Sequence, residues 1–278
     1  MHTLIVDRYH GLGNDYLVAA EGPAMTADFA RAVCDRHRGV GSDGVLEPAD
    51  PGPADYGVRI WNPDGSIAEK SGNGLRIFAQ WLVDVRNAPR RFSVWTGVCL
   101  VHCDVGDDVI AVDMGHASFE PADVPVLADA PLLDGALPGG PWKVCAVGLG
   151  NPHCVVFVDD PDAVPWRAWG ATLEVHPSFP NRTNVQIAAV TGPASVDVRV
   201  WERGAGETAA SGSSACAVAS AAVRTGRLAP GKIMVTMPGG ALSVDVGPGY
   251  ALRLVGPVER VGRVVLDGDW VKRRLGAA

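Results

Sequence analysis

The sequence predicts an α/β (α+β) protein made of two pseudo-symmetric lobes in tandem, each a mixed or antiparallel β-sheet wrapped around a central helix. Three observations support this. Short segments repeat at an offset of about half the 278-residue chain, and both halves follow the same order of strand, turn and apolar helix. The content of 34 Gly and 21 Pro is typical of many turns and short strands.

The repeat consists of four pairs of segments that occur in the same order. The pairs are Val58–Trp61 with Val198–Trp201 (offset 140), Ser71-Gly72 with Ser211-Gly212 (140), Gly11–Asn14 with Gly148–Asn151 (137), and Asp104–Gly106 with Asp245–Gly247 (141). A period this long and this regular indicates two homologous units. The stretch 116–142 is rich in Pro, Ala, Asp and Gly and suits a boundary. We expect an N-terminal lobe over 1–117, a C-terminal lobe over 118–262, and a final segment, 263–278, that packs back on the first lobe.

Hydrophobic patterning places equivalent elements in each half. Alternating residues predict strands at 58–61, 98–105, 109–114, 197–201, 232–237 and 241–246. The apolar runs 74–85 and 214–224 predict one helix per lobe, and the small residues of the second suit a buried, closely packed helix. Strands wrapped around these two helices are the simplest way to bury them.

Composition excludes several classes of function. The net charge is −7 and no basic block is present, which argues against nucleic acid as a partner. No stretch reaches 18 consecutive apolar residues and the start of the chain lacks a signal-peptide pattern, so we expect no membrane span and a cytoplasmic location. The six cysteines form no CxxC pair, which predicts reduced thiols and no metal site.

Ser71-Gly72 and Ser211-Gly212 each lie where a turn enters a predicted helix. The simplest interpretation is that both serines are N-caps. A helix N-terminus also presents free backbone N–H groups and a partial positive charge, which suit a carboxylate. Because a duplicated lobe brings equivalent loops face to face, we expect both helix ends, with one serine each, to line an interlobe cleft.

Longer motifs around these serines resemble the diaminopimelate epimerase family of cofactor-independent amino-acid racemases and epimerases. The matching segments are Asn62–Gly74, Glu202–Thr208 with Ser211-Gly212, His10–Asp15, Gly150–His153 and Phe179–Asn184. The resemblance covers essentially the whole chain. It implies catalysis without pyridoxal phosphate or metal, in which one cysteine thiolate removes an α-proton and a second cysteine returns one on the opposite face.

The resemblance also implies a set of site residues. Ser71 and Ser211 take the two catalytic positions, and Gly72, Asn73, Gly212 and Ser213 offer backbone N–H groups to the substrate α-carboxylate. The distal groups of diaminopimelate would be recognised by Asn62, Asn151, Asn184, Glu202 and Arg203, with Asn14 lining the same pocket. His153 and Glu202 would lie near the two acid/base positions. The implied partner is a small amino acid or dicarboxylate, and the implied assembly is a homodimer.

The sequence departs from the family pattern at both catalytic positions, because serine replaces cysteine. A thiol has a pKa of about 8.5 and a hydroxyl one closer to the 15.7 of water, so about seven units, or roughly 10 kcal/mol, oppose formation of the base. Cys154 and Cys216 are near in sequence but not at the equivalent positions. Lys70, directly before Ser71, is a possible alternative base or simply a solvated lysine. Gly44 stands where some members carry glutamine.

Three functions remain open at this level. The first is a diaminopimelate epimerase that is impaired or altered by its serines. The second is a divergent paralogue that catalyses another proton shift, such as double-bond isomerisation of a carboxylic acid, with Lys70 as base. The third is an amino-acid binder without catalysis.

Overall fold

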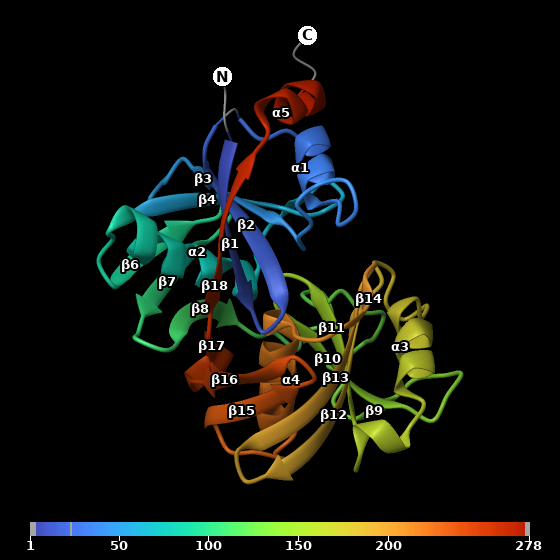
Figure 1. Ribbon diagram of the computed structural model, residues 1–278. Coiled ribbons are helices and arrows are strands. Elements are labelled where there is room, and N and C mark those ends of the chain that lie inside the picture. The colour runs from blue at the N-terminus through green and yellow to red at the C-terminus, as the bar shows by residue number, and fades with distance from the viewer. Residues whose placement is uncertain (1–3, 23, 276–278) are drawn as a thin grey trace. The chain divides into compact units, whose positions relative to one another are not determined.

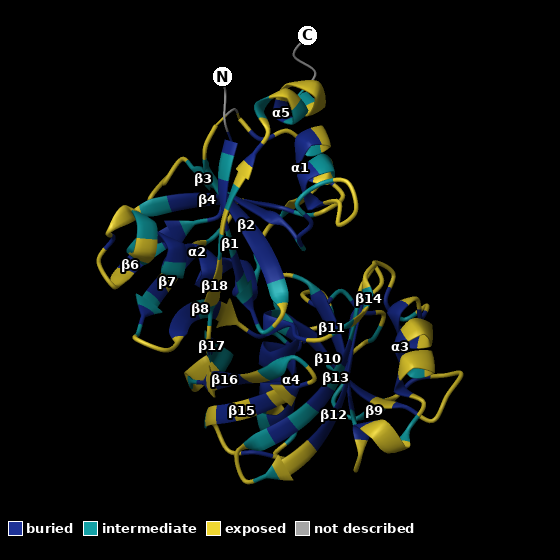
Figure 2. Cartoon of the chain, in the orientation of Figure 1, coloured by how far each residue is buried: buried dark blue, intermediate teal, exposed yellow. Residues whose placement is uncertain are grey.

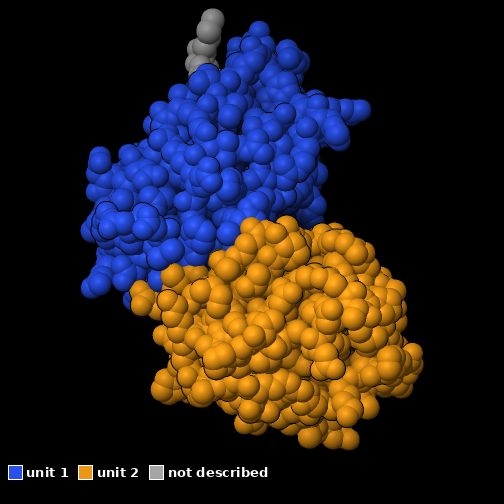
Figure 3. Space-filling model, turned by 60° about the horizontal axis from the view of Figure 1, so that its bottom comes forward, with its two compact units in different colours: residues 1–112, 256–278 blue, residues 113–255 orange. Residues whose placement is uncertain are grey.

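The computed structural model describes residues 4–22 and 24–275. The chain divides into two compact units (Figure 3). Unit 1 comprises residues 1–112 and 256–278, and unit 2 comprises residues 113–255. The C-terminal segment therefore belongs to the same unit as the N-terminus.

Unit 1 contains a mixed sheet in the order β18-β1-β2-β3-β4-β6-β7-β8 (Figure 1). Two neighbouring pairs, β2–β3 and β4–β6, are parallel and the others are antiparallel. The short β5 forms a hairpin with β4. The strand bounds are β1 Leu4–Gly11, β2 Asn14–Glu21, β3 Val45–Ala49, β4 Tyr56–Trp61, β5 Ile67–Ala68, β6 Arg91–Trp95, β7 Leu100–Val105, β8 Ile110–His116 and β18 Glu259–Leu266.

Helix α2, Gly72–Arg86, is the core element of unit 1 (Figure 2). Ten of its residues are buried, Gly72 to Ala79 and then Trp81 and Leu82. The helix begins after the N-cap Ser71 and ends at Asn87, whose φ of 54° places it in the left-handed region that often closes a helix. Strands β1, β2 and β7 pack against the helix and bury its apolar residues.

Two short helices form a second apolar cluster in unit 1. Helix α1, Ala27–Cys34, buries Phe29, and the ring of Trp270 in α5, Gly268–Leu275, packs edge-on against it at 5.9 Å. Strand β18 is tied to β1 by Asp7, which accepts hydrogen bonds from Arg260 and Arg263. These contacts join the two ends of the chain within one unit.

Unit 2 repeats this topology in its own strands, in the order β9-β10-β11-β12-β13-β15-β16-β17. The parallel pairs are β11–β12 and β13–β15, and β14 forms a hairpin with β13. The strand bounds are β9 Gly135–Ala136, β10 Lys143–Gly148, β11 Pro152–Phe157, β12 Asn184–Gly192, β13 Ser195–Glu202, β14 Gly206–Thr208, β15 Gly231–Met237, β16 Gly240–Val246 and β17 Ala251–Gly256.

Helix α4, Gly212–Arg224, fills the centre of unit 2. Its buried residues are nearly all Ala, Ser, Cys or Val, so strands can approach its backbone closely. Helix α3, Trp166–Glu174, covers a separate cluster that includes Trp142 and Phe179. Two single-turn 3₁₀ helices, Pro161–Ala163 and Pro248–Tyr250, complete the unit.

The two units share strand order, strand direction and a central helix, so the predicted fold class is confirmed. Every strand predicted from alternation corresponds to an observed strand, and the helices predicted at 74–85 and 214–224 lie within α2 and α4. The local patterns succeeded because each element buries one regular set of side chains.

Candidate functional site

The serines that precede α2 and α4 have nearly the same backbone conformation. Ser71 has φ −140° and ψ 117°, and Ser211 has φ −143° and ψ 123°. The Gly74 N–H donates to Ser71 Oγ at 3.0 Å, and the Ser214 N–H donates to Ser211 Oγ at 3.4 Å. Both serines are therefore N-caps, with side chains held at the start of a helix.

Capping leaves two backbone donors at each helix start without an intrahelical acceptor. In α2 the cap serine accepts from the N–H groups of Gly74 and Leu75, and in α4 it accepts from those of Ser214 and Ala215. By helix geometry, the remaining donors are the N–H groups of Gly72 and Asn73, and those of Gly212 and Ser213. These four groups coincide with the residues expected to hold a carboxylate.

A chain of amide and charged side chains organises the first turn of α2. The Arg76 guanidinium, which is fully buried, donates to Asn73 Oδ1 at 2.7 Å. Asn73 Nδ2 donates to Asn14 Oδ1 at 3.0 Å, and Asn14 Nδ2 donates to Asp43 at 2.8 Å. The structure thus brings Asn14 and Asn73 together beside Ser71. Their amides are oriented by this network.

The Ser71 hydroxyl has a second partner in Tyr16 of β2. Tyr16 Oη lies 3.1 Å from Ser71 Oγ. The Tyr16 ring occupies space that the absence of a side chain at Gly44 leaves free, since a Cβ there would lie 2.6 Å from the ring. Gly44 therefore determines where the ring can lie.

Asn62 and Lys70 occupy the turns on either side of β5. Asn62 Nδ2 donates to Ser66 Oγ at 2.9 Å, and its backbone carbonyl accepts from Gly65, so its side chain helps to close the β4–β5 turn. Lys70 is half-buried directly before Ser71. Both residues belong to the segment that leads into α2.

In unit 2, His153 of β11 is wholly buried in a polar network. Gln186 Nε2 donates both to His153 Nδ1 at 3.1 Å and to Ser214 Oγ at 2.9 Å. This network assigns the ring proton to Nε2, which lies 3.0 Å from Asn151 Oδ1 and donates to it. Burial, with a smaller contribution from the charge of Arg203, lowers the pKa of His153 to about 3. The imidazole is therefore neutral at physiological pH.

The side chain of Asn184 positions the segment that carries Glu202 and Arg203. Asn184 Oδ1 accepts the Arg203 backbone N–H at 3.0 Å, and its Nδ2 donates to the Pro152 carbonyl at 3.0 Å. The Arg203 guanidinium is exposed and donates to the Asn181 carbonyl at 3.2 Å. Glu202 is half-buried at the end of β13.

The nearby cysteines are not placed to replace the missing thiols. Cys154 and Cys216 are both fully buried, and Cys216 lies on α4 five residues beyond Ser211. Burial, with a smaller effect of Cys145, raises the pKa of Cys154 well above the usual thiol value. Among residues 4–22 and 24–275, no three side chains of the metal-binding types gather into a cluster.

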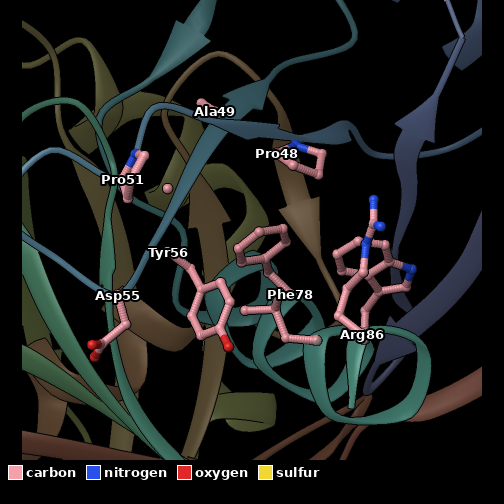
Figure 4. A pocket seen from close by; sticks show the side chains of 10 residues that line it. Pro48, Ala49, Pro51, Asp55, Tyr56, Phe78 and Arg86 are labelled. Carbon is pink, nitrogen blue, oxygen red and sulfur yellow. The ribbon is translucent and has the colours of Figure 1, made fainter. Parts of the chain in front are cut away.

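An apolar pocket of about 300 Å³ lies elsewhere in unit 1 (Figure 4). It is lined by residues of β3, β4 and α2, including Tyr56, Phe78 and Trp81, with Asp55 and Arg86 among its polar residues. None of the site residues expected from the sequence lines it. The pocket is therefore distinct from the helix N-termini described above.

Sequence reasoning missed Tyr16, Gln186 and Ser214 as partners of the expected site residues. One signal was available for Tyr16, because the offset of 137 that relates Asn14 to Asn151 also relates Tyr16 to His153. The contacts of Gln186 and Ser214 depend on strand pairing and left no comparable local pattern.

Paired helix N-termini with capping serines in a duplicated fold are consistent with an isomerase that binds a carboxylate, and comparison with known proteins supports this class. The family profile for diaminopimelate epimerase matches residues 7–120 and 145–256. Diaminopimelate epimerase of Desulforudis audaxviator is 42% identical over 95% of this chain and 98% of its own. Diaminopimelate epimerase 2 of a Nostoc species is 39% identical over 94% of this chain and 95% of its own.

A solved structure shows the same fold at much lower identity. The hydroxyproline epimerase from Agrobacterium vitis has a TM-score of 0.71 and 17% identity, covering 97% of this chain and 94% of its own. The chain belongs to the diaminopimelate epimerase family and is an isomerase of the epimerase class. Within the described residues, no helix is long and apolar enough to cross a membrane.

Proposed function

We propose that the protein is an epimerase-type isomerase, working without pyridoxal phosphate, that binds diaminopimelate or a closely related α-amino dicarboxylate. The observation that carries the proposal is the matched capping at Ser71 and Ser211, which leaves two backbone donors at each helix start. In each unit the two donors, those of Gly72 and Asn73 or those of Gly212 and Ser213, are suited to bind the α-carboxylate, and the helix dipole adds to their attraction for an anion.

In this proposal the distal end of the ligand is read by polar side chains. Arg203 binds the second carboxylate, because its planar guanidinium can donate two parallel hydrogen bonds. Its backbone is fixed by Asn184 while its head group is exposed. Asn62, Asn151, Asn184 and Glu202 complete the set that recognises the distal amino and carboxylate groups, and Asn14 lines the same pocket.

Ser71 and Ser211 occupy the two acid/base positions, and we expect them to slow α-proton exchange at neutral pH. Their capping bonds come from neutral backbone N–H groups. Such groups and a helix dipole stabilise an anion by about 0.3–2 kcal/mol, far less than the roughly 10 kcal/mol separating a hydroxyl from a thiol. We therefore expect the protein to bind its ligand but to exchange the α-proton slowly.

The binding proposal is tested with Arg203→Ala and a matched control. Arg167→Ala removes another arginine of unit 2, one that is paired with Glu207 and lies outside the proposed site. We expect calorimetry to show that Arg203→Ala weakens diaminopimelate binding by roughly 2–4 kcal/mol, since a charge-assisted pair is lost. Arg167→Ala should leave the affinity unchanged.

Lysine, which lacks the distal carboxylate, serves as the control ligand. Arg203→Ala should barely change its affinity. Equal losses for lysine and diaminopimelate would show that Arg203 only supports the fold. Absence of diaminopimelate binding to the unmodified protein would overturn the proposed function.

We also propose a cytoplasmic location and a homodimer. All six cysteines are free thiols, which suits a reducing compartment. Val261 and Val265 of β18 are 57% and 63% exposed on a strand that pairs with β1. Light scattering at micromolar concentration tests the dimer, and a monomeric mass would refute it.

A further inference from the structure

We propose that Tyr16 and Ser71 form a proton relay in unit 1, in which the Tyr16 phenol is the group that gains or loses the proton. This inference rests on the proposed function, because it assigns a carrier for the α-proton. It concerns unit 1 alone and names a residue that acts through Ser71.

The geometry places the two hydroxyl groups in direct hydrogen-bond contact. Tyr16 Oη and Ser71 Oγ are 3.1 Å apart, and Ser71 Oγ also accepts the Gly74 N–H at 3.0 Å. The contact distance permits proton transfer between the hydroxyls. Tyr16 is 6% exposed, so bulk water has little access to its phenol, whereas Ser71 is partly exposed.

The packing around Gly44 allows the Tyr16 ring to occupy the position from which it contacts Ser71. A Cβ on Gly44 would lie 2.6 Å from Tyr16 Cε1 and 3.0 Å from Cδ1. Any other residue at position 44 would therefore displace the ring from its present place. The position of the Tyr16 ring thus requires glycine at position 44.

The internal duplication gives independent support. In unit 1, Leu17 pairs with Val45 across parallel strands, and in unit 2 Cys154 pairs with Val185 at the equivalent place. One residue earlier on β2 and β11, Tyr16 is therefore the counterpart of His153. Each unit therefore has an ionisable side chain at this position: Tyr16 contacts the cap Ser71 directly, and His153 is linked through Gln186 to Ser214 in the first turn of α4.

The chemical advantage lies in the acidity of the phenol. An ordinary tyrosine has a pKa of about 10, against about 15.7 for water as the reference for an aliphatic hydroxyl. When the phenolate form is present, the substrate Cα–H bond breaks and its proton passes to Ser71 Oγ. The Ser71 proton moves to Tyr16 Oη, and the electron pair of the broken bond remains on the substrate as an enolate-like carbanion. The reverse transfer reprotonates carbon and regenerates the phenolate.

Several charged groups lie on the elements around β2 and can influence this titration. Arg76, a buried cation on α2, donates to the side chain of Asn73, two residues beyond Ser71. The other ionisable side chains on β2 and on these neighbouring elements are Asp15 and Glu21 on β2, Asp7, Arg8, Tyr9 and His10 on β1, Asp84 and Arg86 on α2, Lys70 before α2, Asp43 in the 42–44 loop and Glu47 on β3. The pH dependence measured below therefore reports the relay in this setting.

The test compares Tyr16→Phe with Tyr9→Phe in the full-length protein. Tyr9 pairs directly with Tyr16 across β1 and β2, but its hydroxyl donates to Asp84, near the other end of α2. We measure deuterium incorporation at the α-carbon of diaminopimelate by NMR between pH 7 and 10.5. The unmodified protein should exchange about tenfold faster per pH unit until the phenol titrates.

Tyr16→Phe should lower the exchange rate at pH 9.5 by at least about 100-fold and remove this pH dependence. Tyr9→Phe should change the rate less than about twofold. Ser71→Ala, with Tyr16 retained, should also give a slow and flat profile, so the result does not rely on one variant.

Two results would overturn the relay. One is an unchanged pH profile in Tyr16→Phe, which would make the contact merely structural. The other is no exchange by the unmodified protein at any pH. In both cases calorimetry separates the two proposals, because intact diaminopimelate binding refutes only the relay, whereas lost binding refutes the proposed function as well.

Discussion

Restoring a thiol at both cap positions is the sharpest test of how the serines limit this protein. Ser71→Cys and Ser211→Cys place sulfur at the start of α2 and α4, where each serine now accepts a backbone N–H. The same N–H groups and the helix dipole would stabilise a thiolate. The double variant should therefore carry one ionisable thiol in each unit.

The expected gain can be estimated from two opposing effects. At pH 7.5 a thiol of pKa about 8.5 is roughly one-tenth ionised, whereas a hydroxyl near 15.7 is ionised to roughly 10⁻⁸, a difference of about 10⁷. The alkoxide is intrinsically the stronger base. With a Brønsted coefficient of about 0.5, the greater base strength of the alkoxide offsets roughly half of the 10⁷-fold difference on a logarithmic scale. The net increase in exchange rate over serines acting without the Tyr16 relay, as in a Tyr16→Phe background, is therefore about 10³–10⁴.

Deuterium incorporation from heavy water into each stereoisomer of diaminopimelate, followed by NMR, measures this gain. Each single cysteine variant should recover less than the double, because inversion requires an acid and a base on opposite faces of one carbon. Exchange with retention of configuration is the expected signature of a single thiol. If the double variant binds diaminopimelate yet exchanges no faster than the unmodified protein, the assignment of these positions is wrong. If the unmodified protein is already fast at pH 7.5, a group other than the serines is the base, and Tyr16 and Lys70 are the two to test.

Three further predictions concern stability, measured as the free energy of unfolding in urea. Burial lowers the pKa of His153 to about 3 in the folded protein, whereas the same side chain has a pKa of 6.5 in the unfolded chain. The folded state therefore has its full stability above pH 6.5 and loses stability as the pH falls below that value, because only the unfolded chain then takes up the proton. The protein should lose about 2.5 kcal/mol between pH 7 and 4.5, and His153→Gln should remove most of that loss; an equal loss in the variant would contradict a buried neutral imidazole. Burial raises the pKa of Asp7, but hydrogen bonds from Arg263, Trp81 and Arg260 outweigh it and lower the pKa overall. Asp7→Asn should therefore cost about 2 kcal/mol at pH 7, a cost that shrinks as acid protonates the carboxylate, and a pH-independent cost would count against this explanation. Gly44→Ala should cost about 1–3 kcal/mol, since its Cβ would meet a backbone carbonyl and the Tyr16 ring at 2.6 Å; a neutral effect would show that this region yields easily.

The sequence alone determined the duplicated architecture and the position of both helix starts. The repeat offsets related segments 137 to 141 residues apart, and hydrophobic periodicity located the strands and central helices. Ser71 and Ser211 were identifiable as caps because capping depends on a serine, a following helix and little else. These features are local or periodic, so they leave a direct trace in the order of residues.

Tertiary structure decided which side chains meet those caps. Tyr16 reaches Ser71 across 55 positions of sequence, and Gln186 joins His153 to Ser214 across 33 and 28. Such contacts depend on strand register and on the space left by neighbours, as at Gly44, and no local pattern encodes either. The neutral state of His153 likewise follows from its complete burial, because the cost of charging an imidazole is set by the surroundings that folding places around it.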